Sequence, residues 1–211
     1  MFNKLFDRSN GLMITMSWIT DCLFLSMLWM LFSVFLIPLG PATAALYDTA
    51  VHTFRHEEEV VYGRFFQSMK KNLKVGIPAG LICLAIGFGG YQLWNTIGAA
   101  AVESDMGYML LWGYFFVYML VIGLIGFLFT LLSRFETGLI QLFVNTVVIG
   151  VAHLPRLLAV CMICAVTIWI CVWQWWPVIF LPCLSALLAS FFIEPIFEKY
   201  MPKKEEKTEE L

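Results

Sequence analysis

Long apolar segments alternate with shorter polar segments along this chain. A helix needs roughly 20 mostly apolar residues to cross the hydrocarbon core of a bilayer, and about five segments approach that length. The predicted spans are residues 12–37, 75–100, 108–133, 156–172 and 177–197. The first apolar run has no small-x-small cleavage site, which favours a retained anchor over a signal peptide. The pattern therefore predicts an all-α integral membrane protein, with residues 1–211 forming a single membrane domain.

The segment between the first two spans, residues 38–74, is too polar to cross a membrane and is expected to form cytoplasmic helices. Gly40 can serve as the N-cap of a helix and Pro41 as its first residue, because proline lacks an N–H that a helix start leaves unpaired. This predicts a helix from Pro41 to about Arg55. A second helix is expected to end near Lys74, since acidic residues precede it and lysines close it, in the order that the helix dipole favours.

The second predicted helix has two different faces. Its apolar residues recur every four positions as Val61, Phe65, Met69 and Leu73. The opposite side is basic, with Arg64, Lys70, Lys71 and Lys74. Two interpretations stay open for the basic side: it meets anionic lipid headgroups, or it docks an acidic protein partner.

Two further segments complete the pattern. Residues 137–152 are moderately apolar but short, with Gln141 and Asn145 among them, which predicts an amphipathic interfacial helix after the third span. The tail, residues 198–211, is rich in lysine and glutamate and has no apolar period, which indicates a polar, frayed end.

Composition agrees with a membrane location, since 61% of the residues are hydrophobic, 13% are charged and the mean hydropathy is +0.83. The basic residues gather in the two predicted non-spanning segments and in the tail, so the positive-inside rule places these parts and the C-terminus in the cytoplasm. Five spans would then put the N-terminus outside, although Lys4 and Arg8 lie there. The charges leave the side of the N-terminus open.

Few residues suggest chemistry. Asp21 is the only ionisable residue that we place clearly within a span, and no span offers it a basic partner. It is either protonated or reaches the interface, or else it contacts a neighbouring helix or a partner subunit. His52 and His56 have a spacing that could hold zinc, but a third ligand is undefined, so a solvated helix face is the preferred interpretation.

Common catalytic patterns are absent from the sequence. It contains no GxSxG, Walker A or GxGxxG motif. We therefore predict no catalytic residues, no cofactor and no metal, and expect that the chain is not an enzyme.

One stretch resembles a known family. The residues concerned are Trp29 in the first span, then Ile37-Pro38-Leu39-Gly40-Pro41-Ala42-Thr43-Ala44-Ala45-Leu46-Tyr47, Phe65-Phe66-x-x-Met69-Lys70-Lys71-Asn72, and His153-Leu154-Pro155. In this order they resemble the YesL-like family of bacterial membrane proteins. Family members commonly have a proline and a threonine before the Gly-Pro pair, and an asparagine where this chain has Ser26 in the first span.

The resemblance implies a function through gene context. Genes of the family in Firmicutes commonly lie beside those for carbohydrate ABC importers. This implies a non-catalytic accessory or assembly subunit in the bacterial cytoplasmic membrane, which packs against ABC permease subunits near the ATPase and has no nucleic-acid partner. The residues expected to contact a partner or lipid are Asp21, Gly40, Pro41, Thr43, Arg64, Phe66, Lys70, Lys71 and Asn72.

A different class of function stays open as the alternative. An autonomous channel or transporter for small solutes is suggested by a weak internal repeat and by five glycines in the second span. These glycines are Gly76, Gly80, Gly87, Gly89 and Gly90. Glycines in a membrane helix more often let neighbouring helices approach closely.

Overall fold

The computed structural model describes residues 11–55, 61–101 and 105–200, and every regular element in these ranges is helical. The helices are α2 (Gly11–Ser33), α3 (Leu39–Arg55), α4 (Val61–Ala101), α5 (Asp105–Arg134), α6 (Leu139–Ala152), α7 (Leu154–Trp173), the short 3₁₀ helix η1 (Trp176–Ile179) and α8 (Leu181–Tyr200). The predicted all-α fold is confirmed. The predicted polar tail lies outside the described residues, except for its first part, which continues α8.

Four helices are long and apolar enough to cross a membrane, as expected of a membrane protein: α2, α4, α5 and α7. The fifth predicted span falls on η1 and α8, whose apolar part, Leu181–Phe197, is shorter. The predicted interfacial helix at residues 137–152 matches α6, which has a similar shorter apolar length. Within the residues that the structure describes, the long apolar helices therefore number four, and α8 is shorter.

Helix α4 differs from the prediction, because it does not end near Lys74. It runs for 41 residues without a break and contains Pro78 in its interior. At 1.5 Å per residue its length is about 60 Å, roughly twice the hydrocarbon core of a bilayer. The basic segment and the second predicted span are therefore two halves of one continuous helix.

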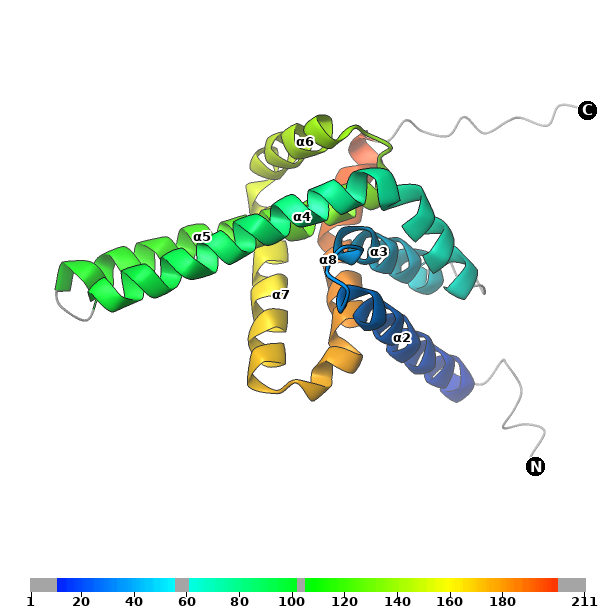
Figure 1. The fold of residues 1–211 in the computed structure, drawn as a ribbon. Coiled ribbons are helices and arrows are strands. Elements are labelled where there is room, and N and C mark those ends of the chain that lie inside the picture. The colour runs from blue at the N-terminus through cyan, green and yellow to red at the C-terminus, as the bar shows by residue number, and fades with distance from the viewer. Residues whose placement is uncertain (1–10, 56–60, 102–104, 201–211) are drawn as a thin grey trace, which may run out of the picture.

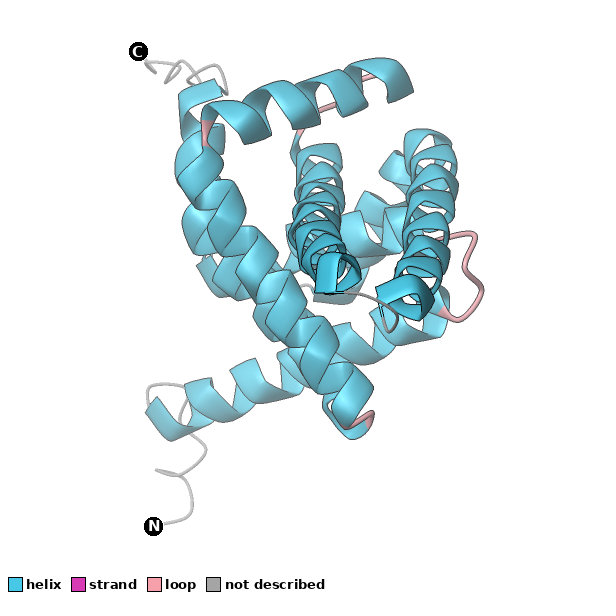
Figure 2. Ribbon diagram, turned by 90° about the vertical axis from the view of Figure 1, so that its left-hand side faces the viewer, coloured by secondary structure: helices cyan, strands magenta, loops and turns pink. Residues whose placement is uncertain are grey.

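Helices α4 and α5 form a long antiparallel hairpin that projects from the rest of the molecule (Figure 1). Two tyrosines of α5 fasten it: Tyr114 Oη donates a hydrogen bond to the carbonyl oxygen of Gly90 at 2.5 Å, and Tyr118 Oη donates to that of Gly87 at 3.0 Å. A Cβ at Gly90 would overlap the Tyr118 ring, so this glycine lets the two helices approach. Helix α7 crosses the hairpin steeply, as the view along the hairpin in Figure 2 shows.

Helix α3 occupies the centre of the fold and contacts α2, α4, α5 and α8. It runs back along α2, since Trp29 hydrogen-bonds Thr43 near the start of α3 and the Trp18 ring contacts Phe54 near its end. Its alanines at positions 42, 44, 45 and 50 are fully buried. The helix begins close to where the Gly-Pro pair predicted it, but the structure corrects the expectation of a surface helix. Small side chains are what allow four helices to pack around it.

Candidate functional site

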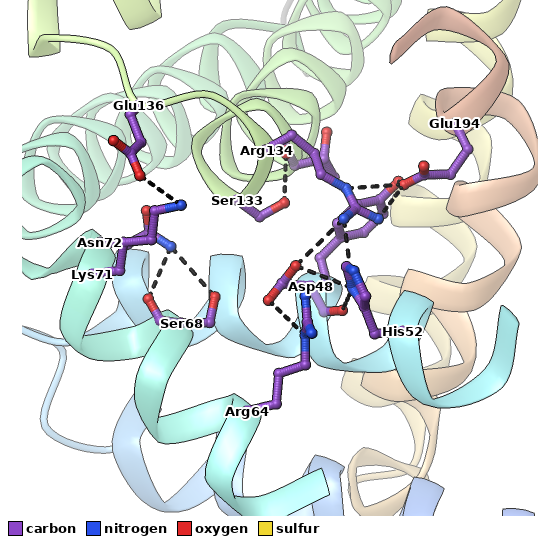
Figure 3. Close-up of polar contacts among 12 residues, drawn as sticks. Asp48, His52, Arg64, Ser68, Lys71, Asn72, Ser133, Arg134, Glu136 and Glu194 are labelled. Carbon is purple, nitrogen blue, oxygen red and sulfur yellow. Dashed lines mark hydrogen bonds and ion pairs between the residues drawn. The ribbon is translucent and has the colours of Figure 1, made fainter. Parts of the chain in front are cut away.

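A buried network of charged side chains lies where α3, α4, α5 and α8 meet (Figure 3). Asp48 of α3 and Glu194 of α8 are only 7% and 8% exposed. Arg64 of α4 and Arg134 of α5 supply the positive charges. Two carboxylates therefore face two guanidinium groups inside a largely apolar protein, where an unpaired charge would be very costly.

Arg134 joins the two carboxylates. Its Nη2 lies 2.8 Å and its Nε 3.2 Å from Oε1 of Glu194, while its Nη1 lies 3.5 Å from Oδ1 of Asp48. The same Oε1 of Glu194 accepts a hydrogen bond of 3.1 Å from the hydroxyl of Tyr47. Three hydrogen-bond donors thus surround one buried carboxylate oxygen and compensate for its loss of contact with water.

Asp48 is held by partners on its own helix and on two others. Arg64 Nε lies 3.3 Å from its Oδ2, and His52 Nδ1 lies 3.3 Å from its Oδ1. Burial acts to raise the pKa of the Asp48 carboxyl, but the hydrogen bond from His52 and the charges of Arg64, His52 and Arg134 outweigh it and hold this pKa below its ordinary value. The folded protein therefore stabilises Asp48 as the carboxylate.

His52 lies one turn after Asp48 on α3, and its ring nitrogen Nδ1 contacts both Asp48 and Arg134. Its Nδ1 lies 2.9 Å from the carbonyl oxygen of Asp48, which accepts a hydrogen bond only when this nitrogen is protonated. The same Nδ1 lies 3.5 Å from Nη1 of Arg134, a pure donor. A proton on Nδ1 therefore favours the contact with Asp48 and opposes the contact with Arg134.

The network ties α3, α4, α5 and α8 together through paired charges. Among the described residues, no group of three or more histidines, cysteines and carboxylates could hold a metal ion. The spacing of His52 and His56 in the sequence allows a zinc site formed by these two residues. Of the two, His56 lies outside the described residues. The network places two negative and two positive side chains on four helices. The positions of these helices therefore depend on one another.

Sequence reasoning missed this network and singled out Asp21 instead. Asp21 is partly buried on α2 and hydrogen-bonds the side chain of Ser17, apart from the network. Asp21 stays a predicted partner or lipid contact, and the structure adds Asp48, Arg134 and Glu194 as buried ionisable residues. A usable signal was present, because Arg134 and Glu194 are charges of opposite sign that each follow a long apolar run.

The Gly-Pro pair predicted as a partner or lipid contact lies inside the fold. A Cβ at Gly40 would overlap the carbonyl oxygen of Gly76 on α4 and lie 3.1 Å from Cα of Gly80. A Cβ at Gly76 would lie 3.0 Å from the ring of Pro41. The pair therefore forms the close crossing of α3 and α4, and both residues are buried. Thr43, one turn further along α3, accepts a 3.1 Å hydrogen bond from Nε1 of Trp29.

The remaining predicted contact residues, all on α4, divide into two sets. Arg64 belongs to the network, and Asn72 is buried with its Nδ2 donating to the Ser68 carbonyl at 2.9 Å. Lys71 pairs with Glu136 after α5 at 2.8 Å, and this contact lowers the pKa of the exposed Glu136 carboxyl. By contrast, Phe66 and Lys70 are exposed and line a groove on the surface.

Part of the chain matches a known family model. Residues 22–91 match the family described as "Protein of unknown function, DUF624". The match covers 70 of the 211 residues and includes the close crossing of α3 and α4 together with Asp48 and Arg64. Arg134 and Glu194 lie beyond it. Comparison with curated proteins and with solved structures gave no match.

Proposed function

We propose that this chain is a non-catalytic accessory or assembly subunit of a bacterial carbohydrate ABC importer. It packs against the permease in the cytoplasmic membrane, with its C-terminus on the cytoplasmic side. The DUF624 match supports this, because YesL-like proteins belong to that family and the match contains the segment from Ile37 to Tyr47 that carries the resemblance. The choice of an importer as the partner rests on the gene context that this resemblance implies.

The observation that carries a role in packing against a partner is the outer surface of the α4–α5 hairpin. An added Cβ would meet no atom within 4 Å at Gly87, Gly89 and Gly98 of α4 and Gly113 of α5. Glycines at a membrane helix surface let a second helix approach closely. Gly87 and Gly98 are 11 residues, or about three turns, apart, so they share one face of α4, and a helix of another subunit can pack there.

Other glycines of α4 are already used within the chain. Gly76 and Gly80 pack against α3, and Gly90 packs against Tyr118 of α5. These contacts explain three of the five glycines that suggested a channel or transporter. Gly87 and Gly89 are the two that the fold leaves open, and Gly87 belongs to the proposed partner surface.

The test is co-purification in mild detergent from the native host. Permease subunits should accompany the parent protein, and the double variant Gly87→Leu/Gly98→Leu should lose them while it keeps its melting temperature. The matched control is Gly138→Leu, which replaces a glycine outside the hairpin where an added Cβ is equally free of neighbours. This control should keep the partners.

Two outcomes would contradict the proposal. One is a monomer without associated proteins, combined with unchanged sugar uptake after deletion of the gene. The other is solute flux into liposomes that contain this chain alone, which would favour the channel or transporter.

A further inference from the structure

An open groove runs along the surface between the end of α2 and the first half of α4. It has a volume of about 700 Å³ and is lined by Phe32, Phe66, Gln67, Met69, Lys70 and Leu73. Four of these six side chains are apolar and uncharged at any pH. The lining of the groove is thus mostly apolar, with the amide group of Gln67 and the ammonium group of Lys70 as its polar parts.

The groove lies where α2 ends and where the basic half of α4 meets its apolar half. Helix α2 ends at Ser33, one residue after Phe32, and the chain stays apolar through Ile37. On α4 the last lysine before the long apolar part is Lys74. The Phe32 and Phe66 rings meet edge to face, with centroids 5.9 Å apart.

The basic residues of α4 are not equivalent. Arg64 pairs with Asp48, and Lys71 pairs with Glu136. Lys70 and Lys74 are exposed, and neither forms an ion pair with any residue that the structure describes. They lie four residues apart, so they share one face of the helix, and Lys70 is itself part of the groove lining.

We propose that this groove binds an anionic phospholipid. Its phosphate lies at the ammonium groups of Lys70 and Lys74, and an acyl chain lies along Phe32, Phe66 and Met69. A lipid satisfies both halves of the site, because its headgroup supplies the negative charge and its chain covers the apolar lining. Free phosphate would leave the apolar lining uncovered.

This inference stands apart from the importer proposal. Lys70 and Lys74 lie on the opposite half of α4 from the open glycines at positions 87, 89 and 98. Loss of lipid binding and loss of permease binding are therefore expected from different variants.

The test compares binding of phosphatidylglycerol and phosphatidylcholine to the purified full chain by native mass spectrometry. The parent should prefer phosphatidylglycerol. Each lysine near a charged lipid surface contributes about fivefold in affinity, so Lys70→Gln/Lys74→Gln should weaken phosphatidylglycerol binding by about 25-fold. The control Arg156→Gln/Lys199→Gln removes the same charge away from the groove and should bind as the parent does.

A further variant tests the apolar half of the site. Phe66→Ala should weaken binding of both lipids, because it removes a contact with the acyl chain that the two lipids share. The ratio of phosphatidylglycerol to phosphatidylcholine should stay unchanged. All variants replace exposed side chains, except Arg156, which is partly buried, so a melting temperature equal to that of the parent is the check of folding.

Three results would overturn the inference. The first is equal binding of the two lipids by the parent protein. The second is unchanged phosphatidylglycerol binding by the double lysine variant. The third is a lysine variant that keeps the lipid but loses an associated acidic protein, which would make the groove a protein docking site.

Discussion

Arg134 and Glu194 lie 60 residues apart in the chain, yet their side chains form an ion pair of 2.8 Å. Each side chain is only 11% exposed. The pair connects α5 to α8, and through Nη1 of Arg134 it extends to Asp48 on α3. Loss of one partner from such a buried pair leaves an uncompensated charge in the protein interior.

Replacement of Arg134 by methionine should destabilise the protein by about 3–5 kcal/mol, because Glu194 and Asp48 both lose a buried cation. Adding Glu194→Gln should cost less than the sum of the two single changes, since the double variant removes a charge of each sign. Thermal unfolding in detergent of the parent, both single variants and the double variant measures this coupling.

The exposed pair of Lys71 and Glu136 gives the control for that cycle. Its side chains are 50% and 77% exposed, so water screens their attraction. Lys71→Met should leave the melting temperature nearly unchanged. A loss as large as that for Arg134→Met would show that the burial of the network has no special importance.

Several elements could be predicted from local sequence patterns. The apolar segments at residues 12–37, 108–133 and 156–172 correspond to long apolar helices, and the Gly40-Pro41 pair marks the start of α3 to within two residues. These features depend on neighbouring residues in the chain. Hydrophobic pattern and proline geometry are therefore sufficient to find them.

The continuity of α4 and the burial of α3 depend on contacts that local patterns do not contain. The lysines up to Lys74 look like the end of a helix, and Pro78 removes a backbone donor. Packing of Gly76 and Gly80 against Gly40 holds the helix together through this region. In the same way Asp48 looks like a surface charge until Arg134 approaches it from 86 residues away.

The close crossing of α3 and α4 should be sensitive to a single methyl group. Gly40→Ala places its Cβ against the carbonyl oxygen of Gly76, where only backbone movement can make room. We expect a loss of about 1–3 kcal/mol in the free energy of unfolding. Gly89→Ala on α4 is the matched control, because its Cβ meets open space and alanine favours a helix. Equal effects of both changes would contradict the close crossing.

The hydrogen bond between Trp29 and Thr43 should contribute to the packing of α2 on α3. Thr43→Val keeps the shape of the side chain but removes the acceptor for Trp29 Nε1. The expected loss is about 1 kcal/mol in the free energy of unfolding. Thr20→Val on α2 is the control, since its hydroxyl only donates to the Met16 carbonyl within its own helix. An effect of Thr43→Val no larger than that of the control would show that the contact contributes little.

Acidification should weaken the fold through Asp48. Because its folded-state pKa lies below the ordinary value of 3.8, the carboxylate stabilises the protein fully above about pH 4, and this contribution disappears as pH falls through the folded-state value. Asp48→Asn should therefore melt at a lower temperature than the parent at pH 6, and the difference should shrink as pH falls toward 3. Glu136→Gln, at an exposed carboxylate, should show only a small difference at either pH. If the gap between parent and Asp48→Asn stayed constant from pH 6 to 3, the carboxylate charge would not be what stabilises the junction of α3, α4 and α5.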